Sequence, residues 1–146
     1  MVGRLALFAI VSFVFHFIWE SAHIHLYTTY ETLGSGTSLL LLATAGDVLY
    51  ALLGVACVAI VFRDCKWLEH PNTRHVLAAM AYGFIIAVLI EWKALILHKW
   101  AYTTAMPIVP VVRVGLSPVL QMVVLVPLAV WVTFYCYKSL DRNNSL

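Results

Sequence analysis

Residues 5–27 read LALFAIVSFVFHFIWESAHIHLY, and this stretch decides the fold. Its length of about 23 residues lets one helix cross about 30 Å of hydrocarbon. The same stretch nevertheless carries ionisable side chains, which hydrocarbon penalises. These are His16, Glu20, His23 and His25. The stretch therefore predicts a membrane helix with one face turned toward protein or water rather than toward lipid.

The composition of the rest of the chain agrees with a membrane location. The chain has 146 residues, of which 63% are hydrophobic and 11% charged, and its mean hydropathy is +0.93. A soluble domain has about a quarter of its residues charged, so too little polar surface is present to coat a soluble globule. We expect one transmembrane domain over residues 1–146. The net charge of +2, with no basic run and no glycine-rich phosphate loop, argues against a nucleic-acid partner.

Four stretches are long and apolar enough to cross the bilayer. They cover about residues 5–27, 38–62, 76–97 and 116–137. Each must satisfy its backbone polar groups within lipid, so each is predicted to be a helix. The sequence therefore predicts an all-α integral membrane protein, a four-helix bundle. The aromatic and proline-containing link before the last stretch is predicted to lie along the membrane interface, and so are Trp19, Trp67 and Trp100.

Basic residues outside the spans predict the orientation. Six of them fall at the two termini and in the second link, and two fall in the other links. The first set is Arg4, Arg63, Lys66, Arg74, Lys138 and Arg142, and the second is Lys99 and Arg113. Because basic residues favour the cytoplasmic side, both termini are predicted to be cytoplasmic.

Each predicted helix contributes one polar side chain at a similar depth. At 1.5 Å per residue these side chains lie about 8–14 Å from the non-cytoplasmic boundary. They are Glu20, Asp47, Glu91 and Gln121. A lone carboxyl at such depth costs on the order of 2–3 kcal/mol, so three of them need partners or a water-filled pocket. We predict one buried polar pocket in the outer half of the bilayer.

Histidine and tyrosine side chains are predicted to lie beside this polar layer. His16 and His23 lie four residues before and three residues after Glu20, and therefore on the same helix face. Asp47 and Tyr50 share a face in the same way. A structural alternative remains open, because intramembrane polar groups also join helices by hydrogen bonds of about 0.6 kcal/mol each.

Such a pocket suits acid–base chemistry on an apolar lipid. A carboxyl group desolvated by hydrocarbon can hold a proton at neutral pH, and a neighbouring histidine can accept one. Protonation of a carbon–carbon double bond gives a carbocation, which aromatic faces and carboxylates stabilise. The ligand that this chemistry indicates is a membrane-soluble small molecule, isoprenoid-like or sterol-like, which would be bound, isomerised or cyclised by proton transfer.

Two motifs resemble a known family. The segment FHFIWESAHIHLYTTYE at 15–31, with His16 four residues before Glu20, and the string GDVLY at 46–50 are similar to the emopamil-binding-protein (sterol Δ8–Δ7 isomerase, EXPERA-type) family. The resemblance covers about a quarter of the chain. It implies a small helical membrane bundle that shifts a double bond, with His16 and Glu20 as proton donor and relay and an acid on another helix stabilising the cation.

A second resemblance concerns the location. EWKALILHKWAY at 91–102 and GLSPVLQ at 115–121 resemble segments of small bacterial four-helix membrane proteins. We therefore expect a multi-pass protein of the bacterial inner membrane.

These arguments give a set of candidate site residues. The candidate catalytic residues are His16, Glu20, Asp47 and Glu91, and the candidate substrate-binding residues are His23, Tyr50, Trp92 and Gln121. Trp92 is expected to form an aromatic wall of the pocket. No cofactor and no metal ligand is part of this prediction.

Three other functions of these polar residues remain open on the basis of the sequence. Glu20-x-x-His23 matches half of a di-iron motif and could bind a metal together with Asp47 and Glu91. The same acids could handle ions or protons. Finally, the polar layer could dock the protein as a homo-oligomer or as a non-catalytic subunit of a larger membrane complex.

Overall fold

The four predicted helices are present in the computed structural model, which describes residues 1–28 and 36–143. They are α1 (Val2–His23), α3 (Gly36–Phe62), α4 (Thr73–Ile96) and α5 (Leu116–Asn143). All four are long and apolar enough to cross a membrane. The prediction of an all-α, multi-pass four-helix bundle is therefore confirmed.

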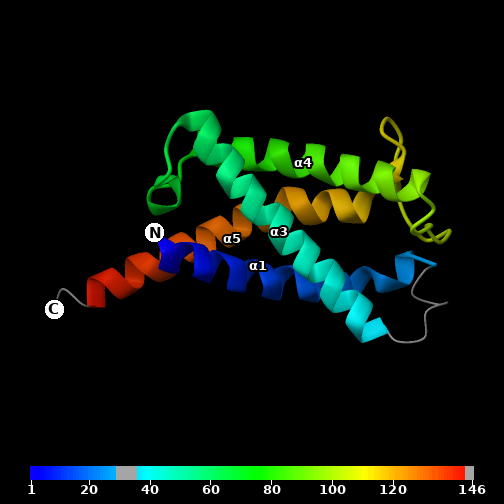
Figure 1. Cartoon of the computed structure of the whole chain (residues 1–146), viewed down its shortest axis with the longest axis horizontal. Coiled ribbons are helices and arrows are strands. Elements are labelled where there is room, and N and C mark those ends of the chain that lie inside the picture. Colours follow the sequence, from blue (N-terminus) through cyan, green and yellow to red (C-terminus); the bar gives the residue numbers. More distant parts are fainter. Residues whose placement is uncertain (29–35, 144–146) are drawn as a thin grey trace.

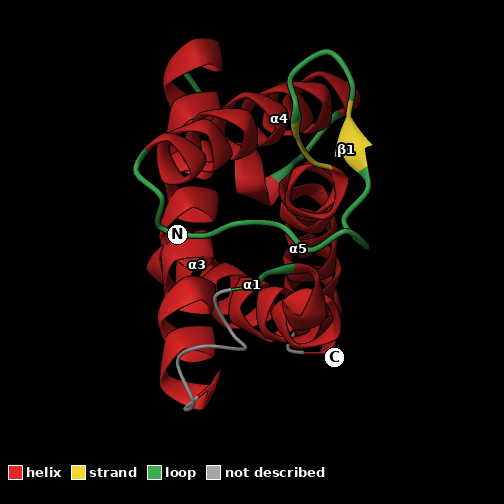
Figure 2. Cartoon of the chain, turned by 90° about the vertical axis from the view of Figure 1, so that its right-hand side faces the viewer, coloured by secondary structure: helices red, strands yellow, loops and turns green. Residues whose placement is uncertain are grey.

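The bundle has three helices along its long axis and one across them. In Figure 1, α1, α4 and α5 follow the long axis, whereas α3 crosses them obliquely. Both α1 and α4 pack against α5 and against α3, and Figure 2 shows this arrangement from one end. The start of α1 and the end of α5 lie at the same end of the molecule (Figure 1). The cytoplasmic location of that end stays a prediction.

Glycines set how closely the helices approach. A Cβ atom on Gly83 would lie 2.6 Å from the backbone oxygen of Met122, so α4 and α5 touch there without any side chain between them. A Cβ atom on Gly54 would meet the ring of Tyr82 at 2.7 Å. The position of Gly46 is different, because no atom lies within 4 Å of such a Cβ atom. The α3 helix therefore leaves open space beside Gly46.

The end that carries both termini is closed by a short polar link and an aromatic cluster. The link contains η2 (Trp67–Glu69), and Asn72 caps α4 by accepting hydrogen bonds from the backbone N–H groups of Arg74 and His75. Trp67 is 1% exposed and donates to the carbonyl oxygen of Val55 at 3.1 Å. The ring of Trp67 is therefore packed inside the bundle and does not face lipid, and its depth in the membrane stays a prediction.

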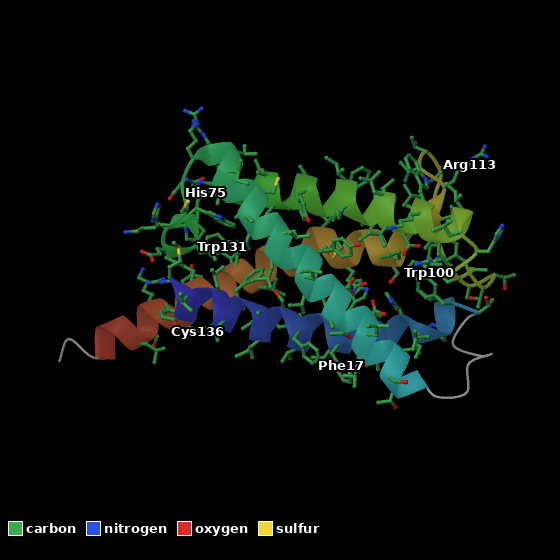
Figure 3. All side chains as sticks on the ribbon, in the orientation of Figure 1. Phe17, His75, Trp100, Arg113, Trp131 and Cys136 are labelled. Carbon is green, nitrogen blue, oxygen red and sulfur yellow. The ribbon has the colours of Figure 1, made fainter. Side chains whose placement is uncertain are left out.

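The opposite end is closed by the link between α4 and α5. This link pairs with the chain after α1, where η1 (Ile24–Leu26) is followed by an isolated bridge between Tyr27 and Tyr102. The link then forms a short antiparallel hairpin, whose strands β1 (Ile108–Val109) and β2 (Val114–Gly115) have two residues each. Figure 3 labels Trp100 and Arg113 at this end and His75 at the other. The link thus folds back on the bundle.

Candidate functional site

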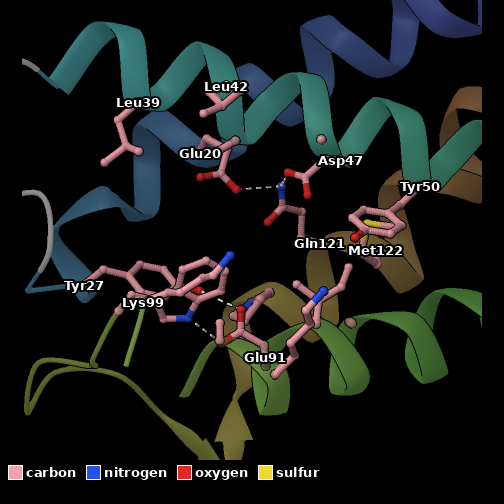
Figure 4. Close-up of a pocket in the computed structure, with 18 residues that line it drawn as sticks. Glu20, Tyr27, Leu39, Leu42, Asp47, Tyr50, Glu91, Lys99, Gln121 and Met122 are labelled. Atoms are coloured by element: carbon pink, nitrogen blue, oxygen red, sulfur yellow. Dashed lines mark hydrogen bonds between the residues drawn. The ribbon is translucent and has the colours of Figure 1, made fainter. Parts of the chain in front are cut away.

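A cavity of about 360 Å³ lies at the hairpin end of the bundle. Its walls come from α1, α3, α4, α5 and the link after α4, and Figure 4 shows the side chains that line it. The polar residue predicted on each helix lines this cavity. These residues are Glu20, Asp47, Glu91 and Gln121, and Tyr50 lines it as well. Residues far apart in the sequence are therefore brought to one place, as the depth argument predicts.

Gln121 of α5 connects three of the helices through one side chain. Its amide nitrogen Nε2 lies 3.0 Å from Oε1 of Glu20 and 2.8 Å from Oδ2 of Asp47 (Figure 4). The same nitrogen lies 3.0 Å from Nδ1 of His16. An amide nitrogen has only two hydrogens, so it can donate a full hydrogen bond to at most two of these three neighbours. Two carboxyl groups from different helices thus meet at a single donor.

The two histidines of α1 lie behind the carboxyls and do not line the cavity. His16 is fully buried, and its Nδ1 lies 3.5 Å from Oδ2 of Asp47. His23 places Nε2 3.3 Å from Oε1 of Glu20 and Nδ1 2.7 Å from the hydroxyl of Ser117. Each histidine therefore contacts one carboxyl of the pair and can exchange a proton with it, without facing the cavity itself.

Glu91 has a separate set of partners on the other wall of the cavity. Its carboxylate accepts hydrogen bonds from the hydroxyl of Tyr27 at 3.5 Å, the indole N–H of Trp100 at 3.3 Å and the hydroxyl of Tyr102. The backbone N–H of Gly115 in turn donates to the Tyr102 oxygen at 2.9 Å. The link thus directs the indole of Trp100 to this carboxylate, and the interfacial depth of Trp100 stays a prediction.

Both tyrosines are held in the protonated form that can donate. Burial raises the pKa of the Tyr102 phenol, and the hydrogen bond to Glu91 raises it further. Burial likewise raises the pKa of Tyr27, with the charge of Glu91 as the next cause. Glu91 therefore keeps its donors throughout the neutral pH range.

A left-handed turn at the end of α4 brings the link back to the cavity. His98 has a φ of 51°, a backbone conformation that residues with a side chain rarely adopt. The N–H of His98 bonds to the carbonyl of Leu95, and the N–H of Lys99 bonds to that of Ala94. This pattern is a Schellman motif, which ends the helix and reverses the chain direction. Consequently Lys99 and the following indole line the cavity.

The site contains three residues that the prediction from sequence does not include, and one predicted residue lies outside it. Tyr27, Trp100 and Tyr102 were not assigned to the site, although the aromatic residues in LYTTY and HKWAY are the signal that could have indicated them. Trp92 does not line the cavity; it is 44% exposed and donates to the carbonyl of Val112 at 2.7 Å. Trp92 is directed instead at the link after α4, whose Val112 carbonyl accepts its indole N–H.

The side chains of the metal-binding alternative do not come together as a metal site in the described residues. Within residues 1–28 and 36–143, no group of three histidine, cysteine, aspartate or glutamate side chains is placed to hold a metal ion. Glu20 and Asp47 are directed at the amide of Gln121, and Glu91 is held apart by its aromatic donors. The ligand set of Glu20, His23 and these acids therefore does not converge on one point.

No family model, curated protein or solved structure matches this chain. The resemblance to the sterol isomerase family therefore stays a prediction that depends on the two motifs alone.

Proposed function

We propose that the cavity binds a membrane-soluble, isoprenoid-like or sterol-like small molecule and isomerises or cyclises it by proton transfer. The observation that carries this proposal is the arrangement of Glu20 and Asp47, two carboxyl groups on one amide nitrogen at the wall of the cavity. Most of the other lining residues are apolar, which suits a ligand delivered by the bilayer.

The carboxyl pair is suited to hold and release a proton. Two negative charges this close in a poorly solvated site repel strongly, so the pair favours sharing one proton. Glu20 or Asp47 can then act as the acid toward a double bond in the cavity. The carboxylate that remains can take up the proton that the resulting cation loses from a neighbouring carbon, which forms the new double bond. His16 and His23, each beside one member of the pair, can return the proton or accept a second one.

The opposite wall supplies groups that stabilise positive charge. The Glu91 carboxylate and the rings of Tyr27, Tyr50 and Trp100 all line the cavity. A carbocation formed near these groups would gain from the carboxylate charge and from the electron-rich ring faces. The division of labour is then a proton source in the carboxyl pair of α1 and α3, and cation stabilisation by the Glu91 carboxylate of α4 and the aromatic rings.

The first arm of the test uses lipid that remains bound during purification. We expect Glu20→Gln and Asp47→Asn to retain about tenfold less of the bound molecule, because each removes a charged partner of the Gln121 network. Mass spectrometry of the extracted lipid measures the retained amount. Glu69→Gln, which changes an acid outside the cavity, is the matched control and should retain wild-type amounts.

The second arm tests the chemistry. Membranes containing the wild-type protein are incubated in deuterium oxide, and the extracted molecule is analysed for deuterium bound to carbon. Proton transfer to a double bond predicts incorporation with the wild type and loss of incorporation with Glu20→Gln. If both substitutions leave retention and exchange unchanged while they lower the thermal stability of the bundle, the polar layer is structural and the proposal fails.

A further inference from the structure

Two lysines line the cavity beside its acids. Lys93 lies in the last turn of α4 and Lys99 lies just after the turn that ends this helix, and both contribute to the cavity wall. Figure 4 shows Lys99 on the same side as Tyr27 and Glu91, across from Glu20. The site predicted from the sequence includes neither lysine. Both lysines are exposed rather than enclosed by protein.

The acids of the cavity are occupied by other partners. Glu91 accepts three hydrogen bonds from aromatic side chains, and Glu20 and Asp47 contact the amide of Gln121 and a histidine each. Among the residues that the structure describes, the two lysines of the cavity therefore have no acidic ion-pair partner.

Charge placement divides the cavity into two parts. The lysines belong to the end of α4 and the link, near Glu91 with its aromatic donors, whereas apolar side chains such as Leu39, Leu42 and Met122 cover other parts of the wall. Lysine stems cover apolar surface while their ammonium groups stay in a polar region. A ligand that matches both parts has an apolar body and a negatively charged end.

We propose that the ligand is an anionic amphiphile, an apolar chain or ring system that ends in a phosphate or a carboxylate bound by Lys93 and Lys99. This inference rests on the proposed function, in which the apolar body reaches the carboxyl pair. The anionic end fixes the ligand at the link, and the length of the apolar body decides which of its carbons lies beside Glu20 and Asp47. Binding at the lysines thus gives the site a means of choosing the carbon that is protonated.

The experiment compares a charged and an uncharged ligand of equal chain length. Purified protein in a neutral maltoside detergent is titrated with dodecyl phosphate, with dodecanol and with inorganic phosphate, and binding is followed by the shift of the thermal unfolding midpoint. We expect dodecyl phosphate to bind more tightly than dodecanol. This preference should fall by about thirtyfold in the double variant K93Q/K99Q, because each lysine near a membrane surface favours an anion by about fivefold.

The controls separate this inference from the function on which it rests. The variant K66Q/K138Q removes two exposed lysines at the other end of the molecule and should keep the wild-type preference. A shift with inorganic phosphate alone also supports the anion site and shows that it does not require the tail. Equal shifts with dodecyl phosphate and dodecanol, or an unchanged preference in K93Q/K99Q, would overturn the inference.

The cavity itself is tested with Gly46→Leu. This substitution places a side chain into open space and should abolish binding of both ligands without disturbing helix packing. In one outcome, Gly46→Leu abolishes dodecanol binding and the wild type shows no preference for dodecyl phosphate over dodecanol. This outcome would support the cavity as a binding site and overturn the proposal of an anionic ligand. Binding of both ligands that survives Gly46→Leu would show that neither occupies the cavity, and this outcome would overturn both proposals.

Discussion

Single residues explain why a polar layer is tolerated inside the bundle. The amide of Gln121 joins Glu20 and Asp47, and the phenol of Tyr102 joins Glu91 to the backbone of Gly115. The first of these groupings could be predicted from the equal depths of residues on separate helices. Depth counting does not apply to the second, because Tyr102 lies outside the spans; only the aromatic residues of HKWAY indicate it.

The hydroxyl of Tyr102 should contribute measurably to stability. In Tyr102→Phe, both the buried carboxylate and the N–H of Gly115 lose a partner, which costs about 1–3 kcal/mol for each unsatisfied group. We expect a lower free energy of unfolding in detergent, measured by denaturant titration. Tyr135→Phe changes an exposed tyrosine on α5 and should change stability by less than about 0.5 kcal/mol. Equal stability of Tyr102→Phe and the wild type would contradict the assigned bonds.

The stability that the Tyr102 phenol contributes should depend on pH. Because burial and then Glu91 raise the pKa of Tyr102 above its ordinary value of 10.0, the unfolded chain ionises first as the pH rises. The stabilisation is therefore fully present below about pH 10 and is lost above it. We expect the difference in stability between the wild type and Tyr102→Phe to shrink above this pH. Denaturant titrations at a series of alkaline pH values measure it.

At the scale of elements, hydropathy places the helices and local backbone geometry places their ends. The expected span at 38–62 differs from α3 by two residues at its start, because the apolar run itself fixes the helix. The first expected span continues to residue 27, but α1 ends at His23 and the chain tightens into η1 before it meets the link. That change depends on pairing with residues far along the chain, which an apolar run does not reveal.

The end of α3 offers a test of a strained helix terminus. Arg63 has a φ of 52°, and its N–H and that of Asp64 form the Schellman bonds to Ile60 and Ala59. Glycine adopts this conformation without the cost of about 1–2 kcal/mol that a side chain incurs. Arg63→Gly should therefore raise the free energy of unfolding by about 1 kcal/mol, whereas Arg74→Gly within α4 should lower it by about 0.5–1 kcal/mol. Unchanged or reduced stability of Arg63→Gly would contradict the backbone geometry.

At the scale of the whole molecule, the sequence predicts the number of helices but not how they cross. Glycines at 46, 54 and 83 look equivalent in the sequence as sites of close packing. Gly83 meets the backbone of α5 and Gly54 meets a tyrosine ring, whereas Gly46 faces open space because α3 crosses the bundle obliquely. The cavity arises from this crossing, and a crossing angle depends on side-chain packing across the whole bundle rather than on any one segment.

The orientation of the bundle decides which leaflet supplies the ligand. The basic residues predict that the end with both termini is cytoplasmic, and the cavity lies at the other end. In a background without other cysteines, Cys65 in the link before α4 should react with a membrane-impermeant maleimide only after the cells are permeabilised. Val111→Cys at the exposed tip of the hairpin should react in intact cells. The reverse labelling pattern would place the cavity in the cytoplasmic leaflet, and labelling of both positions in intact cells would contradict the four spans. With the predicted pattern, a molecule that reaches Glu20 and Asp47 enters from the outer leaflet, so the proposed substrate of the protein must be present in that leaflet.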